Sequence, residues 1–238
     1  MKNIITLIRK ELALYFYSPL AYVIICAYLF FAGYFFYAIV SSSHDANAMR
    51  FTLDFISFIS LIIAPMITMR LLSEEKRSGT LEMLMTVPVT ETQVVVSKYL
   101  SSLAFFMAMN LPTLAYVVLL YKWGKPDGGA LISGYAGLLC LTGIFLAVGL
   151  FVSSFTSNQI IAVIITFVLL IVGYFLGWSS QFVSSPLWKG LLSYAGFFDH
   201  YDSFRKGLID SRDLVYCVSL IVFFLFLSVR MLEARRWR

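Results

Sequence analysis

The chain has 238 residues, of which 60% are hydrophobic and 13% are charged, and its formal net charge is +5. An average soluble domain is roughly 45–50% apolar and about 25% charged, so this composition excludes a soluble globule and a disordered chain. Six bilayer-spanning helices need about 20 apolar residues each, which this chain can supply, and the ~10-residue alternating segments of a transmembrane β-barrel are absent. We therefore expect an all-α polytopic membrane protein, with residues 1–238 forming one membrane domain.

The first predicted element, residues 3–17, is an amphipathic helix that lies in the membrane interface. Its apolar residues recur at helical spacing and share one face: Ile4, Ile8, Leu12, Tyr15 and Phe16. The alternative is that this segment is simply the cytoplasmic end of the first span. Ser18 and Pro19 then provide a helix cap and a proline suited to the first turn of the next helix.

Six uncharged or nearly uncharged runs predict the transmembrane helices, at about 19–40, 51–69, 93–121, 131–152, 160–177 and 213–230. The Thr90–Gln93 segment has capping-box spacing, so we expect a helix to begin at Glu91. Asn110 and Pro112 predict a kink in the third span. Gly173 and Gly177 form a GxxxG motif, which could bring the fifth span close to another helix.

Residues 178–212 are aromatic, but serines, Pro186 and Lys189 interrupt them. We expect a re-entrant or interfacial hairpin on the outer side before the last span, because a seventh span would carry the C-terminal arginines outside. Within it, residues 199–202 read Asp-His-Tyr-Asp. A metal site is conceivable there, but a polar anchor at the outer interface is the preferred interpretation.

The distribution of Lys and Arg predicts the orientation. With the N-terminus inside, eleven basic residues fall on inner segments and seven on outer ones. We therefore place both termini in the cytoplasm and the protein in the bacterial inner membrane, as a multi-pass protein. The positive charge then suits the membrane surface, and nucleic acid is not an expected partner.

The chain lacks the patterns of several kinds of chemistry. No GxxxxGK[ST] phosphate-binding loop and no HExxH motif occurs, and the middles of the predicted spans carry no ionisable residue. The three cysteines lie in apolar runs without a CxxC pair. We expect no catalytic residue, no bound metal and no cofactor on this chain.

The most informative segment is the cytoplasmic region at residues 70–92. Gly79 suits a sharp turn, Thr80 can cap a new short helix, and Pro88 can end it. That helix would present one apolar face, formed by Leu81, Leu84 and Met85. A short amphipathic helix outside the membrane needs a partner surface, and the alternative partner is the chain's own bilayer.

The order of these elements resembles the ABC-2 type permease family, the membrane subunits of ATP-binding-cassette exporters. The matching features are the interfacial helix, Ser18–Pro19, the Ser73–Lys76 block and the Gly79–Glu82 block with Pro88. The segment from Phe204 to Asp210 before the last span is similar to the branch containing the gliding-motility permease subunit. One departure is Ser97–Lys98, where family members often have Gly-Lys.

The resemblance implies a half-transporter that pairs with a second copy or a related permease and docks on two cytoplasmic ABC ATPase subunits, which bind ATP and Mg. Residues 80–87 would be the coupling helix. The implied ATPase-coupling residues are Glu74, Glu75, Gly79, Thr80, Leu81, Glu82, Leu84, Met85 and Pro88. A second, smaller cytoplasmic contact would involve Ser154, Thr156, Ser157 and Asn158.

Two other functions remain open from the sequence. A non-transporting membrane scaffold would not need the helix at 80–87 to bind an ATPase. A secondary carrier would need an ionisable site within the membrane, which the predicted spans do not offer.

Overall fold

The computed structural model describes residues 2–43, 48–80, 89–123, 127–183 and 185–236, and within these ranges it contains helices and no strand. Two 3₁₀ turns, at Leu111–Thr113 and Ser180–Phe182, accompany the α-helices. The α-helices are α1 (Lys2–Tyr17), α2 (Pro19–Ser43), α3 (Ala48–Thr68), α4 (Ser73–Arg77), α6 (Glu91–Asn110), α7 (Leu114–Trp123), α8 (Gly128–Phe155), α9 (Gln159–Ser179), α10 (Pro186–Ala195), α11 (Phe197–Arg205) and α12 (Ser211–Arg236).

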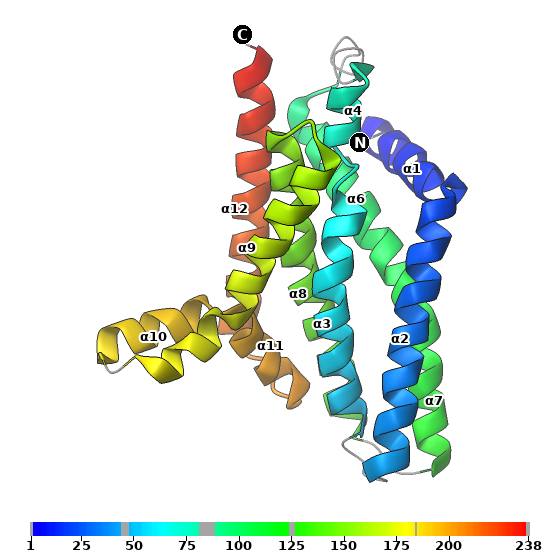
Figure 1. Cartoon of the computed structure of the whole chain (residues 1–238), viewed down its shortest axis with the longest axis vertical. Helices are drawn as coiled ribbons and strands as arrows, with labels where there is room; N and C mark the ends of the chain where they lie inside the picture. The colour runs from blue at the N-terminus through cyan, green and yellow to red at the C-terminus, as the bar shows by residue number, and fades with distance from the viewer. Residues whose placement is uncertain (1, 44–47, 81–88, 124–126, 184, 237–238) are drawn as a thin grey trace.

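Over the described ranges, six helical stretches are long and apolar enough to cross a membrane. They are Pro19–Ser42, Ala48–Arg77, Glu91–Lys122, Gly128–Phe155, Gln159–Ser179 and Ser211–Ala234. The expected all-α polytopic membrane fold is therefore confirmed. Helix α1, helix α4 and the last turns of α12 gather at one end of the bundle, which we call the α4 end (Figure 1).

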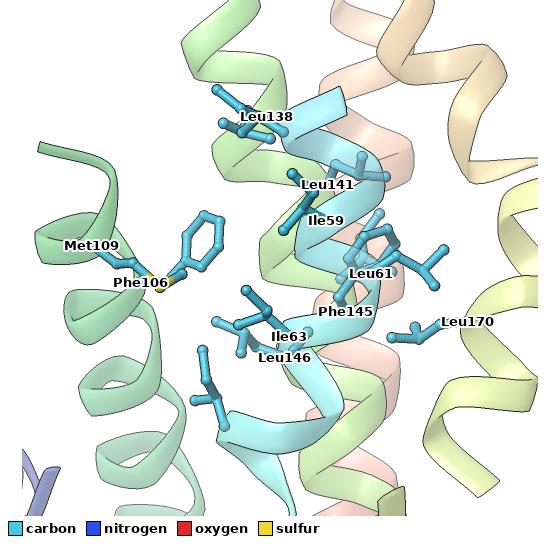
Figure 2. Packing of buried hydrophobic residues seen from close by; sticks show 14 of the residues in the cluster. Ile59, Leu61, Ile63, Phe106, Met109, Leu138, Leu141, Phe145, Leu146 and Leu170 are labelled. Atoms are coloured by element: carbon cyan, nitrogen blue, oxygen red, sulfur yellow. The ribbon is translucent and has the colours of Figure 1, made fainter. Parts of the chain in front are cut away.

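Helix α8 is the centre of the packing. It contacts α3, α9, α11 and α12, and its apolar side chains interlock with those of α3 (Figure 2). Ile59 and Leu61 of α3 face Leu141 and Phe145 of α8, all of them buried. Because lipid tails are as apolar as these side chains, close van der Waals packing rather than exclusion of water holds the two helices together.

Local signals in the sequence account for where several helices begin. The Thr90 hydroxyl accepts a hydrogen bond from the Gln93 backbone amide, and the Gln93 side chain accepts one from the Thr90 amide, both at 3.3 Å. This reciprocal capping box starts α6 at Glu91, as expected. Asp127 and Asn158 cap α8 and α9 in a similar way, each accepting from a backbone amide two residues on.

The third membrane stretch is interrupted where the kink was expected. Helix α6 ends at Asn110, the 3₁₀ turn follows with Pro112 inside it, and α7 continues from Leu114. The Asn110 side chain accepts a hydrogen bond from the Tyr28 hydroxyl at 2.5 Å, which ties the interruption to α2. The polar side chain is thus used inside the protein, in agreement with a structural role.

Between α9 and α12 lie two short helices, α10 and α11, and α10 projects sideways from the bundle (Figure 1). At 10 and 9 residues they are about 15 Å long, half of what a ~30 Å hydrocarbon core requires. The GxxxG motif supports this arrangement. The ring of Phe197 lies over Gly173, and the Asp199 carboxylate lies over Gly177, so α9 uses its glycines to receive the start of α11.

Helix α11 is also bound to α3 by charge. The Arg205 guanidinium pairs with Asp54 of α3 and with Asp202 of α11, and each of these side chains is largely buried. The Tyr201 hydroxyl donates to the Leu53 carbonyl at 3.1 Å. Burial raises the pKa of Tyr201, so its phenol remains a hydrogen-bond donor.

Candidate functional site

The cytoplasmic region expected at 70–92 begins with the short helix α4. Glu74 and Glu75 stand in its first turn and Lys76 and Arg77 in its last, which suits the helix dipole at both ends. Gly79 follows with φ of +71°, a conformation that L side chains rarely adopt, so the expected sharp turn is present. Of the expected coupling residues, Leu81, Glu82, Leu84, Met85 and Pro88 lie outside the described residues.

Helix α4 is fixed to the last turn of α8, just before the link to α9. The Ser153 hydroxyl of α8 accepts hydrogen bonds from the backbone amides of Leu72 and Ser73, both at 3.1 Å. The Lys76 ammonium donates to the Ser154 carbonyl. The two segments that the sequence separately predicted to be cytoplasmic therefore lie against one another.

The four residues of the second expected contact differ in accessibility. Ser154 is buried, and its hydroxyl donates to the Phe151 carbonyl at 2.6 Å. Thr156 is half-buried and accepts from the Asn158 amide. Ser157 and Asn158 are exposed, so these two are the ones that a partner protein could reach directly.

A buried charge cluster, which we call the Lys98 cluster (Lys98, Glu11 and Glu75), joins three helices at the α4 end. The Lys98 ammonium of α6 lies 3.0 Å from a carboxylate oxygen of Glu11 in α1 and 2.8 Å from one of Glu75 in α4. Its side chain is only 2% exposed. A buried ammonium is stable only when paired, and here two carboxylates surround it.

This cluster was not predicted from the sequence. Glu75 was expected to act in coupling, and Lys98 was noted only in the Ser97–Lys98 pair, where family members often have Gly-Lys. The available signal was that Glu11 is the one acidic residue of an otherwise apolar and basic helix. That signal identifies a residue in need of a partner without indicating which one.

Helix α1 is held in place by more than charge. The Tyr15 ring stacks on Phe105 of α6 with centroids 4.8 Å apart, and its hydroxyl donates to the Ile67 carbonyl of α3 at 3.1 Å. Burial raises the pKa of Tyr15 well above its ordinary value, and the nearby Glu11 raises it further. The neutral phenol therefore anchors α1 to α3 and to α6, the helix that carries Lys98.

The Asp-His-Tyr-Asp segment is bound within the protein. His200 lies 2.6 Å from the Asp213 carboxylate and 2.9 Å from the Tyr194 carbonyl, and its ring stacks on Tyr216. Asp202 pairs with Arg205. Over the described ranges no group of three or more His, Cys, Asp or Glu side chains could hold a metal ion, and the segment acts as the anchor that joins α11 to α12.

The comparisons with known proteins agree with this architecture. A family model described as ABC-2 family transporter protein matches residues 6–232. No curated protein sequence matches the chain at a significant level.

Proposed function

The chain belongs to the ABC-2 transporter family, and from this premise we propose that it is the membrane-spanning permease subunit of an ATP-binding-cassette exporter. Two such subunits, identical or related, form the translocation path and dock on two separate cytoplasmic ATPases, which bind and hydrolyse ATP with Mg. Residues 80–87 form the coupling helix. We also assign the chain to the branch of the gliding-motility permease subunit, on the segment from Phe204 to Asp210.

One observation supports this proposal above the others: the helix that precedes residues 80–87 is bound to three membrane-associated elements. Glu75 of α4 pairs with Lys98 of α6, which pairs in turn with Glu11 of α1. The backbone of α4 is hydrogen-bonded to Ser153 of α8. A force applied at residues 80–87 therefore reaches α1, α6 and α8 through short, buried contacts, as coupling to an ATPase requires.

The rival functions receive less support. A secondary carrier needs ionisable groups near the middle of the membrane, whereas Asp54, Lys98 and Asp213 lie near the ends of their helical stretches. A scaffold does not need a short helix tied to the bundle in this way. A gene for an ABC ATPase beside the gene for this chain would favour the permease over both rivals.

The direct test is co-purification. An ABC ATPase encoded beside this chain, co-expressed with it and extracted in mild detergent, should elute with it as a complex of two permease and two ATPase subunits. An unrelated ABC ATPase serves as the control. Elution of this chain without its neighbouring ATPase, while both are well expressed, would contradict the proposal.

We further propose that the α4 end faces the cytoplasm and that residues 178–212 stay on the outer side. Ser185 and Ser211 flank α10 and α11 and are both exposed. In a variant whose native cysteines are replaced, Ser185→Cys and Ser211→Cys should both react with a membrane-impermeant maleimide from outside. Ser157→Cys, at the α8–α9 link, should react only after the membrane is opened. Labelling of Ser185→Cys and Ser211→Cys from opposite sides would mean a seventh span.

A further inference from the structure

A cavity of about 260 Å³ lies at the α4 end, between α1, α2, α3, α4 and α6. Its volume is somewhat below that of typical pockets for drug-sized ligands, so it suits a small polar group better than a whole lipid. The wall has two chemically distinct parts. Apolar side chains form one part: Leu14, Leu20, Ile24, Met66 and Phe105. Charged side chains form the other: Glu11, Arg70, Glu74, Glu75 and Lys98.

Two polar atoms of the charged wall lack a hydrogen bond. Nε of Arg70 and Oε2 of Glu75 are buried, and neither has a hydrogen-bond partner among the described residues. The nearest carboxylate oxygen to Arg70 Nε is Oε2 of Glu74, at 3.9 Å, which is an ion pair without a hydrogen bond. Buried polar atoms are nearly always satisfied, so an unsatisfied donor and an unsatisfied acceptor in the lining of one cavity point to an occupant that provides both kinds of partner.

The charges of the wall restrict that occupant. Three carboxylates face two cations, and Lys98 is already engaged by Glu11 and Glu75. A purely anionic occupant would therefore be repelled by the excess of carboxylates. A group with a cationic donor and an anionic acceptor would complement Glu75 and Arg70 together. The cation must carry N–H groups, because the Glu75 oxygen lacks a hydrogen-bond donor; a quaternary ammonium cannot supply one.

The apolar part of the wall, which we call the apolar rim, indicates where the occupant comes from. Leu14 is 56% exposed and Met66 is 40% exposed, although both line the cavity. In a chain of six membrane helices, exposed apolar side chains at this level contact lipid chains. We infer that this cavity binds the headgroup of a zwitterionic phospholipid with a primary amine, phosphatidylethanolamine, its ammonium on Glu75 and Glu74 and its phosphate on Arg70.

The inference depends on the membrane location of the chain and not on its docking to an ATPase, so the two proposals can fail separately. The full chain, delipidated in detergent, is titrated with phosphatidylethanolamine, phosphatidylglycerol and phosphatidylcholine, and binding is counted by native mass spectrometry. We expect phosphatidylethanolamine to bind at least about tenfold more tightly than the other two, the difference that one charge-assisted hydrogen bond produces. Equal binding of the three lipids, or no lipid retained because water fills the cavity, would overturn the inference.

Variants locate the site. Arg70→Gln with Glu74→Gln removes charges that are 40% and 55% exposed and lie outside the Lys98 cluster, so the chain should fold. This double variant should lose the tenfold preference. The matched control is Arg230→Gln with Glu233→Gln, a similar exposed pair on α12. Equal preference in both double variants would place the lipid elsewhere, and binding of soluble phosphoethanolamine as tight as that of the lipid would contradict the role of the apolar rim.

Discussion

Replacing Lys98 with methionine should destabilise the protein by about 3–5 kcal/mol, the usual cost of removing one partner from a buried ion pair. The ammonium is the shared partner of Glu11 and Glu75, so its loss leaves two carboxylates facing each other in a buried site. We expect a large drop in the thermal unfolding temperature of the purified chain, with α1 becoming more accessible to protease.

Two comparisons separate this effect from a general effect of losing a lysine. Lys122→Met, at an exposed position near the end of α7, should leave the unfolding temperature almost unchanged. Adding Glu11→Gln and Glu75→Gln to Lys98→Met removes the stranded charges and should restore part of the stability. A triple variant less stable than Lys98→Met alone would show that the three charges do not act as one cluster.

Gly196→Ala should separate α11 from α9, whereas Gly190→Ala should not. A Cβ atom at Gly196 would lie 2.6 Å from the backbone nitrogen and 2.7 Å from the Cα of Gly177, and backbone atoms cannot move aside as a side chain can. Overpacking of this kind costs roughly 1–3 kcal/mol. Thermal unfolding should show this loss. When Tyr201→Cys is added, thiol labelling at this position should rise as α11 loosens.

Gly190 provides the matched control from the neighbouring helix. A Cβ atom there meets nothing within 4 Å, and alanine is favoured over glycine inside a helix by up to about 1 kcal/mol. Gly190→Ala should therefore be neutral or slightly stabilising. An equal loss of stability in both variants would mean that the close approach at Gly196 does not hold α11 in place.

The membrane helices could be predicted from the sequence because a bilayer imposes a simple requirement. A span needs about 20 apolar residues with few charges, and the six runs of this chain meet that requirement. The start of α6 could also be predicted, because the Thr90–Gln93 capping box is a local motif whose partners are three residues apart.

Long-range pairings could not be predicted in the same way. Lys98 is 87 residues from Glu11 and 23 from Glu75, and nothing in one sequence states that these three side chains meet. The GxxxG motif shows the same limit: Gly173 and Gly177 predicted a close approach, but that the approach is made by Phe197 and Asp199 depends on the path of the chain through α10.

The most direct test of the central claim compares Leu84→Asp with Thr92→Asp in the complex with the ATPase. Leu84 belongs to the predicted apolar face of residues 80–87, and a charge buried there without a partner would oppose docking. Thr92 is exposed in the first turn of α6, where the helix dipole favours a negative charge.

The measurement is the amount of ATPase that co-purifies, together with the change in ATP turnover that the permease causes. We predict that Leu84→Asp abolishes or strongly reduces both quantities while the variant remains in the membrane, and that Thr92→Asp resembles the unmodified chain. Full ATPase binding and an unchanged effect on ATP turnover in Leu84→Asp would contradict the assignment of residues 80–87 as the coupling helix.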